Sequence, residues 1–295
     1  MAERWLVTGG TGQVGLALQR LPLPGVEVIA PPRGALDLAA LPDLDPLLAG
    51  VSAIINCGAY TAVDKAESEP LMARAINTAA PARLAAAAAR AGIPIIHVST
   101  DYVFPADGQG PWREDDAVAP VSVYGQTKAE GEDAVRASGA RHAIVRTAWV
   151  VSADGANFIK TMLRLGGERD ALNVVADQRG CPTHAGDLAA ALAAITARFT
   201  ADPAQASGTW HCTNAGETTW HGLATRVFAT AADSGLKVPA TVAAITTAEY
   251  PTPARRPTDS RLDCRQVATD FGIEMRPWTE AVDEIVRQLA ERADR

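Results

Sequence analysis

The feature that most constrains the fold is an alternation of short apolar runs with longer helical segments along the first half of the chain. The apolar runs are RWLVT (4–8), VEVIA (26–30), SAIIN (52–56), IPIIHVST (93–100) and HAIVRTAWV (142–150). Helical spacing marks 13–21, 71–92 (with an interruption near Pro81) and 123–138. Short strands that alternate with longer helices indicate a parallel sheet wound with right-handed crossovers. The sequence therefore predicts an α/β fold with a doubly wound parallel sheet.

The pattern loosens after about residue 150, where proline and glycine become frequent. GCPTH (180–184), SGTWH (207–211) and YPTPARRP (250–257) are typical of loops, and helices are expected near 156–167, 185–199, 218–232 and 278–293. We predict a first domain over residues 1–150 and a smaller α/β lobe over 151–295. Some elements of the second part are expected to return to the main sheet.

Composition and charge argue against several classes of protein. The 295 residues carry a net charge of −7, which disfavours a nucleic-acid surface. The N-terminus lacks the basic region and long apolar stretch of a signal peptide, and no apolar run approaches the roughly 20 residues of a membrane span. None of the four cysteines belongs to a C-x-x-C pair, so we expect free thiols and no metal site. We expect a cytoplasmic protein that binds neither nucleic acid nor membrane.

The first strand ends in VTGGTGQVG, in which three glycines are spaced by three residues. A glycine-rich turn lets the backbone approach a pyrophosphate, and the following helix offers free N–H groups and a positive dipole end. An ordinary tight turn is the simpler alternative. Because the triplet follows a strand and opens a helix, we predict a Rossmann-type dinucleotide site. Its members are Gly9, Thr11, Gly12, Gln13 and Val14, with Gly15 as the third glycine.

The choice of cofactor depends on the end of the second strand, which reads Ala30-Pro31-Pro32-Arg33. An acidic residue there would bond the ribose 2′-hydroxyl of NAD, and the segment has none. Arg33 can pair with a 2′-phosphate, although a surface arginine in a loop is an equal alternative. Asp37 is a candidate for the adenine side of the pocket, with a helix N-cap as its alternative. We predict NADPH as the preferred cofactor, with NADH also accepted.

Hydroxyl, phenol and ammonium groups converge on one edge of the predicted sheet. The fourth strand ends in HVSTDYVF, with Thr100 and Asp101 at its carboxyl end, and VYGQTK puts Tyr124 and Lys128 on one helical face. Reduction of a ketone needs a proton on oxygen, and a phenol of pKa about 10 can exchange one when a cation stabilises its phenolate. We predict Tyr124 as proton donor, Lys128 as that cation and a ribose ligand, and Thr100 as a partner of the carbonyl. A chance pair on an exposed helix and a strand-end cap are the alternatives.

At these residues the sequence resembles the extended short-chain dehydrogenase/reductase family, and within it the reductases of dTDP-4-keto sugars. The likeness runs through GGTGQVGLALQR, AYTAVDKAESEP, STDYVFPADGQGPW, VYGQTKAEGE, RTAWVVSADGANFIKTML, VVADQRGCPT, TTWHGLA and YPTPARRPTDSRL, nearly the whole chain. The resemblance implies NAD(P)H-dependent reduction of the C4 ketone of dTDP-4-dehydro-β-L-rhamnose, the last step of dTDP-L-rhamnose synthesis. It also implies that 1–150 binds NADP(H) and that 151–295 mainly holds the sugar nucleotide.

The resemblance implies roles for particular residues as well. Tyr124, Lys128 and Thr100 match the catalytic set. The implied cofactor contacts are Gly12, Gln13, Val14, Asp37, Leu38, Ala59, Tyr60 and Thr61. The implied sugar-nucleotide contacts are Thr100, Asp101, Tyr124 and Trp149, the last with a core tryptophan as its alternative. Weaker candidates for the substrate's diphosphate are Asn157, Phe158 and Arg256, and an exposed structural arginine is the alternative for Arg256.

Two other functions compete with this interpretation. One is the same reduction of another dTDP-4-keto-6-deoxysugar. The other is a non-catalytic, dinucleotide-binding regulatory subunit of methionine adenosyltransferase, against which the intact Thr100, Tyr124 and Lys128 set argues. Some family members hold magnesium with glutamates at a dimer interface, but Gly15-Leu16-Ala17 offers no acid there. We therefore expect no metal-bridged dimer, and either a monomer or a homodimer.

Overall fold

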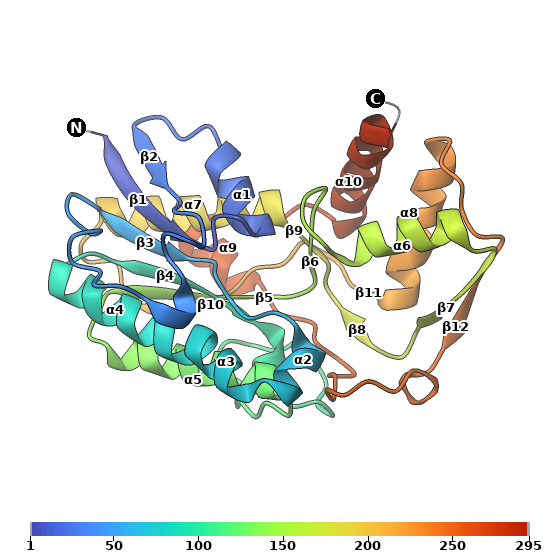
Figure 1. Cartoon of the computed structure of the whole chain (residues 1–295), viewed down its shortest axis with the longest axis horizontal. Coiled ribbons are helices and arrows are strands. Elements are labelled where there is room, and N and C mark those ends of the chain that lie inside the picture. Colours follow the sequence, from blue (N-terminus) through green and yellow to red (C-terminus); the bar gives the residue numbers. More distant parts are fainter. Residues whose placement is uncertain (1, 294–295) are drawn as a thin grey trace.

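The computed structural model describes residues 2–293, and its centre is a six-stranded parallel sheet. Figure 1 shows this sheet with helices on both of its faces. All of its neighbouring strands pair in parallel. Across the sheet the strands are β10 (Gly208–His211), β5 (His142–Thr147), β4 (Ile95–Thr100), β3 (Ala53–Asn56), β1 (Glu3–Thr8) and β2 (Val26–Ile29). The predicted doubly wound α/β fold is confirmed.

Alternate residues along each strand face opposite sides of the sheet. In β1, Trp5 and Val7 pack on one side and Leu6 on the other, and in β3 Ile55 and Ile54 divide in the same way. Strands buried on both faces read as continuous apolar runs, which is why these segments lack a polar alternation. One face is covered by α1 (Gln13–Arg20), α7 (Ala185–Ala201) and α9 (Arg265–Phe271), the other by α4 (Ala80–Ala91) and α5 (Val123–Ala137).

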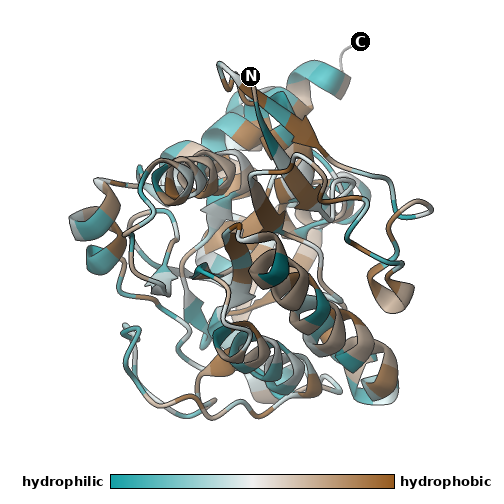
Figure 2. Cartoon of the chain, turned by 90° about the vertical axis from the view of Figure 1, so that its left-hand side faces the viewer, coloured by the Kyte–Doolittle hydropathy of each residue, from teal (hydrophilic) through white to brown (hydrophobic). Residues whose placement is uncertain are grey.

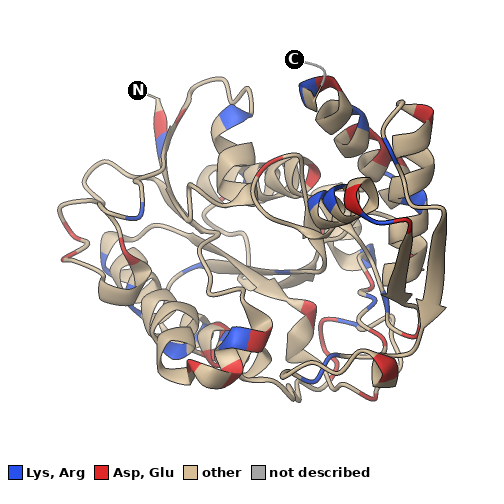
Figure 3. Ribbon diagram, turned by 45° about the vertical axis from the view of Figure 1, so that its right-hand side comes forward, with Lys and Arg blue, Asp and Glu red and all other residues tan. Residues whose placement is uncertain are grey.

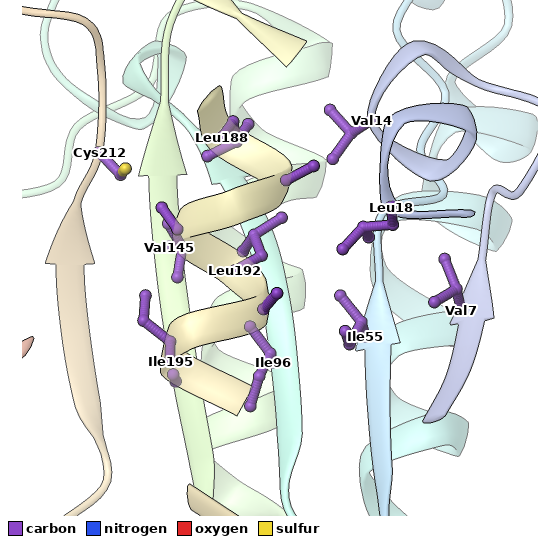
Figure 4. Close-up of a cluster of buried hydrophobic side chains, with 14 of the residues drawn as sticks. Val7, Val14, Leu18, Ile55, Ile96, Val145, Leu188, Leu192, Ile195 and Cys212 are labelled. Atoms are coloured by element: carbon purple, nitrogen blue, oxygen red, sulfur yellow. The ribbon is translucent and has the colours of Figure 1, made fainter. Parts of the chain in front are cut away.

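The core under α1 and α7 joins residues that are far apart in the sequence. Figure 4 shows Leu188 and Leu192 of α7 close to Ile96 and Val145 of the sheet, and Leu18 of α1 packs in the same cluster. In Figure 2 the hydrophobic colour is concentrated in the central strands. Elements from the second half of the chain therefore complete the main sheet and its core.

A smaller lobe lies beside the sheet, on the right of Figure 1. Its apolar core joins α6 (Phe158–Glu168), α8 (Trp220–Asp233) and α10 (Trp278–Ala293). Three two-stranded pairings accompany these helices: β7 (Ala171–Val175) with β12 (Thr241–Ile245), β8 (Arg179–Gly180) with β11 (Thr218–Thr219), and β6 (Val150–Val151) with β9 (Thr183–His184). The helices predicted in this part of the sequence occur within a few residues of their expected bounds.

The structure differs from the predicted elements at two places near the sheet's carboxyl edge. The strand predicted over 142–150 ends at Thr147, because Trp149 has a φ of 47°, outside the extended region. The helix predicted over 71–92 is α3 (Pro70–Arg74), a π-helical turn η2 (Ala75–Ala79) and α4, so the irregularity precedes Pro81. SGTWH (207–211), expected to be a loop, forms β10 of the main sheet. Other elements that the sequence did not indicate are β7, β12, α9, α2 (Val63–Ser68) and the 3-10 turns η1 (Leu38–Ala40), η3 (Asp101–Val103) and η4 (Thr247–Glu249).

Charged residues mark the outside of the molecule. In Figure 3 they lie mostly on helices and connecting loops, while the central strands are largely tan. Within residues 2–293, no helix has both the length and the apolar character needed to cross a membrane.

Candidate active site

Four groups of predicted site residues lie at the carboxyl ends of β1, β3, β4 and β5. The glycine loop follows β1, Ala59–Thr61 follows β3, Thr100 ends β4, and Trp149 comes just after β5. In doubly wound sheets ligands bind at this edge. The parallel topology therefore brings the cofactor and the substrate candidates to one side of the sheet.

The glycine loop is held close to the segment after β3. Gly9 has a φ of +70°, and a Cβ there would lie 2.6 Å from the backbone nitrogen of Gly58. A Cβ on Gly15 would lie 2.3 Å from the Gly9 carbonyl oxygen, so the first turn of α1 rests directly on the loop. Gly12 is the N-cap of α1, and no side chain within the described residues caps it. The free N–H groups and the tight approach fit a pyrophosphate cradle.

The residues predicted for the adenine side lie next to this loop. Asp37 is the N-cap of η1 and accepts a 3.0 Å hydrogen bond from the Ala39 nitrogen. This is the helix-capping role that was the alternative to a role at the adenine. Leu38 packs against Gly58, where an added Cβ would lie 2.3 Å from its Cδ1. Arg33 is 73 % exposed, and its Nε lies 3.6 Å from Asp37 Oδ1. Because an exposed ion pair contributes little to stability, the Arg33 guanidinium can leave Asp37 and bind a phosphate at a small cost in free energy.

The segment after β3 is fixed by a residue that the sequence reasoning missed. Asn77, buried in the π-helical turn, accepts from the Tyr60 nitrogen at 2.8 Å and donates to the Tyr60 carbonyl at 3.2 Å. It also donates to Thr127 Oγ1, which in turn donates to the Tyr124 carbonyl. One amide thus ties Ala59–Thr61 to α5. The available signal was a lone asparagine in an alanine-rich helical segment.

Thr100, Asp101 and Tyr124 form a buried cluster at the end of β4. Thr100 Oγ1 donates to Asp101 Oδ1 at 2.8 Å, and the Thr100 hydroxyl is close enough to Tyr124 to affect the pKa of its phenol. Asp101 is 2 % exposed, and its Oδ2 has no hydrogen-bond partner among residues 2–293. Burial raises the pKa of Asp101 from 3.8 to about 6, while the Thr100 hydroxyl opposes the rise. A buried carboxyl oxygen without a partner is available to a polar group of a ligand.

The electrostatics of Tyr124 differ from the prediction. We expected Lys128 to lower its pKa, but burial dominates and raises the pKa of Tyr124 to about 12, with the Thr100 hydroxyl opposing this. The reason is the position of the ammonium: Lys128 Nζ donates to the Val98 carbonyl at 2.7 Å, on the β4 side. Burial lowers the pKa of Lys128 to about 8. In this state Tyr124 is a protonated phenol, the form that a proton donor requires.

Close backbone contacts and a buried ion pair seat α5 on the sheet. A Cβ on Gly125 would lie 2.2 Å from the Tyr102 carbonyl oxygen, and one on Gly131 would lie 2.1 Å from that of Asn77. Glu132 accepts from Arg146 at 2.8 and 2.9 Å and from Ser99 Oγ at 2.6 Å. Both charged side chains are at most 1 % exposed. The sequence reasoning did not identify this pair, which fixes the helix that carries Tyr124 and Lys128.

An aromatic stack lies at the border of the smaller lobe. The rings of Trp149 and Trp220 stack with centroids 3.6 Å apart, and Phe158 is tilted against Trp220 at 4.8 Å. Gly180 makes room for Trp149, because a Cβ there would lie 2.4 Å from the indole. Trp220 Nε1 donates to Gln178 Oε1 at 3.1 Å. Trp220 therefore stacks on Trp149, the residue predicted as an aromatic wall. The sequence analysis did not name Trp220, and the only signal for it was its place in the TTWHGLA motif.

The remaining substrate candidates make contacts of their own. Arg256 Nη2 lies 2.8 Å from Asp64 Oδ2 of α2, so the 250–257 loop is tied to the other side of the site. Asn157 caps α6 by accepting from the Lys160 nitrogen, and it donates to Gln13 Oε1 at 2.9 Å. Gln13 also donates to the Val150 carbonyl. Asn157 and Gln13 therefore join the glycine loop to the smaller lobe, and their ligand roles stay predictions.

Comparison with known proteins places this site in a family. A family model described as the RmlD substrate binding domain matches residues 3–291. A dTDP-4-dehydrorhamnose reductase from Sinorhizobium fredii is 44 % identical over 290 residues, which cover 97 % of each chain. The chain belongs to the RmlD family of dTDP-4-dehydrorhamnose reductases. An Escherichia coli K12 protein of the same name is 40 % identical, with 96 % of this chain and 97 % of that protein covered.

Solved structures of the family agree with this assignment. The dTDP-4-dehydrorhamnose reductase of Bacillus anthracis, solved in complex with NADP, is 32 % identical, with a TM-score of 0.88. The comparison covers 98 % of this chain and all of that one. The reductase of Clostridium acetobutylicum has the same TM-score at 38 % identity, over 97 % of this chain and 99 % of the other. Family membership thus extends over both lobes, and the resemblance that the motifs indicated is confirmed.

Proposed function

We propose that this protein is an NADPH-preferring ketoreductase that reduces the C4 ketone of dTDP-4-dehydro-β-L-rhamnose to give dTDP-L-rhamnose. The observation that carries the proposal is the full-length match to reductases of that name, on a chain in which Thr100, Tyr124 and Lys128 lie at one sheet edge. The NADP bound to the Bacillus anthracis relative supports NADPH as the preferred cofactor. We propose that NADH is also accepted. The presence of these three residues argues for an enzyme and against a regulatory dinucleotide-binding subunit.

Each residue has a role that follows from its chemistry. The bound nicotinamide supplies the hydride. Tyr124, protonated because burial raises the pKa of its phenol, gives its proton to the C4 oxygen, and Thr100 holds that oxygen through its hydroxyl. We assign Lys128, one turn along α5, to the nicotinamide ribose. Its ammonium must leave the Val98 carbonyl before its charge can stabilise the phenolate that remains. Asp101 directs its free carboxyl oxygen at a sugar hydroxyl.

The binding roles divide between the two lobes. We assign residues 1–150 mainly to the cofactor, with Gly9–Val14 at the pyrophosphate, Arg33 at the 2′-phosphate, Asp37–Leu38 at the adenine side and Ala59–Thr61 near the ribose. We assign 151–295 mainly to the sugar nucleotide, with Trp149 as an aromatic wall. Phe158 supports that wall, and Arg256 meets the diphosphate after it leaves Asp64.

The cellular compartment and the oligomeric state of the enzyme are also proposals. All four cysteines are free thiols, as expected in a reducing cytoplasm. We propose a monomer or homodimer without a metal bridge.

A coupled assay tests the function. dTDP-4-keto-6-deoxyglucose and a 3,5-epimerase generate the substrate, NADPH or NADH is added, oxidation is followed by absorbance, and the product is identified by NMR. We expect dTDP-L-rhamnose, formed faster with NADPH. If NADPH is oxidised only without the epimerase, or only with another dTDP-ketosugar, that rival substrate replaces the proposal. No oxidation with any ketosugar favours the regulatory subunit.

A further inference from the structure

Four buried polar side chains form a line across the carboxyl ends of β1, β3 and β4. Thr8 Oγ1 lies 2.5 Å from Asn56 Oδ1, Asn56 Nδ2 lies 2.9 Å from His97 Nδ1, and His97 Nε2 lies 3.4 Å from Lys128 Nζ. Each of these residues is at most 2 % exposed. The mechanism above uses Lys128 alone, so the other three have no role in it.

The short contact between Thr8 and Asn56 sets the direction of the hydrogen bonds in this line. A separation of 2.5 Å lies in the range of an O–H···O bond and is shorter than an N–H···O bond, so the Thr8 hydroxyl donates to Asn56 Oδ1. Thr8 Oγ1 also accepts from the backbone N–H of Gly58 at 3.4 Å, which its second lone pair allows. The other Asn56 atom is therefore the NH2 group, which leaves His97 Nδ1 as an acceptor.

This order fixes the tautomer of His97. Burial, with the nearby Lys128, holds the pKa of His97 well below its ordinary value, so the ring is neutral and carries one proton. Because Nδ1 accepts, that proton is on Nε2 and faces Lys128 Nζ. A neutral amine accepts such a bond while donating to the Val98 carbonyl at 2.7 Å, whereas an ammonium has no lone pair for it.

We propose that His97 is a positioning residue for the reduction, acting through Lys128: its Nε2–H, oriented by Asn56 and Thr8, faces the amine as a donor and disfavours the ammonium. The inference deepens the proposed function and depends on it for its meaning in catalysis. Besides His97, the titratable groups that act on the charge of Lys128 are Glu132 on α5 and Cys57 after β3, and Tyr124 lies one turn before it on the same helix. Glu132 favours the ammonium, so the chain sets two opposing influences on one lysine.

The substitution Asn56→Asp is expected to reverse the direction of the hydrogen bonds that His97 makes. A carboxylate accepts only, so His97 Nδ1 must donate to it, and Nε2 becomes an acceptor for the ammonium. We expect the alkaline limb of the kcat profile to move upward by about one pH unit or more. His97→Phe, which removes the donor, is expected to move the limb upward as well. His97→Gln, whose amide can still donate, is expected to keep it near the wild-type position. Asn56→Asp combined with His97→Phe measures the effect of the added charge alone.

The direct test is NMR of the full-length protein labelled with ¹⁵N-histidine, with the His97 signals assigned from His97→Gln. We expect the proton on Nε2 in the wild type and on Nδ1 in Asn56→Asp. A wild-type proton on Nδ1 overturns the proposal. So does an alkaline limb that stays in place when His97→Phe lowers activity equally at every pH. The matched control is His211→Phe, a buried histidine that contacts Arg146 and not Lys128, and it should leave the limb in place. NMR detects the His97 tautomer without substrate. The result therefore tests the proposal about His97 separately from the proposed function.

Discussion

Asp101 gives the sharpest prediction about stability, because a buried carboxyl group is expected to weaken the fold when it ionises. Its pKa is raised from 3.8 to about 6 in the folded protein, so the folded state binds the proton more tightly than the unfolded state does. The stability that this provides is present below about pH 4 and is lost as the pH rises to about 6. A difference of about two pH units at about 1.4 kcal/mol each amounts to roughly 3 kcal/mol.

Asp101→Asn removes this titration, since the amide is uncharged at any pH. We expect the variant's free energy of unfolding, relative to the wild type, to increase by about 2 to 3 kcal/mol between pH 4 and pH 8. Urea unfolding at both pH values measures this, and Asp107→Asn, at a residue that is 80 % exposed, is the control that should show no such change. A difference that does not depend on pH refutes the reasoning. Turnover should fall in the variant, because we propose that the Asp101 carboxyl binds a sugar hydroxyl.

Further predictions concern catalysis and ligand binding. Tyr124→Phe should lower kcat by about 10²- to 10⁴-fold with an unchanged melting temperature, whereas Tyr250→Phe, at an exposed tyrosine, should leave kcat unaltered. In the wild type, kcat should decline as the pH rises through about 8, where Lys128 loses its charge; a flat profile to pH 10 argues against that role. Gly15→Ala should weaken NADPH binding measured by calorimetry and cost roughly 1–3 kcal/mol of stability, since its Cβ meets the Gly9 carbonyl. Trp220→Ala should raise KM for the sugar nucleotide about 2- to 10-fold through the lost stack, and an unchanged KM removes Trp220 from the site.

The sequence was informative where local rules decide the structure. Buried strands, a glycine triplet at the first strand–helix turn and the Tyr124–Lys128 spacing each depend on nearby residues only, and the fold and the family that they indicated are confirmed. The bounds of most helices also followed from their apolar spacing. The return of α7 to the main sheet was expected only in general terms, because it depends on packing across the whole chain.

The residues that the sequence did not reveal act through distant partners. Asn77 matters because its amide reaches Tyr60, and Glu132 because Arg146 lies on the neighbouring strand. The direction of Lys128 was also out of reach: helical spacing placed it beside Tyr124, but the Val98 carbonyl holds its amine toward β4. Hydrogen bonds that join a side chain to a distant element leave no periodic pattern in a single sequence.

Transfer of deuterium tests the central claim most directly. The protein is incubated with dTDP-4-dehydro-β-L-rhamnose and NADPH deuterated at C4 of the nicotinamide, prepared in both stereochemical forms, and the sugar is examined by NMR. One of the two forms should yield dTDP-L-rhamnose with deuterium on sugar C4, and Tyr124→Phe should lower the rate of that transfer by about 10²-fold or more. Product without deuterium from either form, or equal rates for the wild type and Tyr124→Phe, would contradict the account.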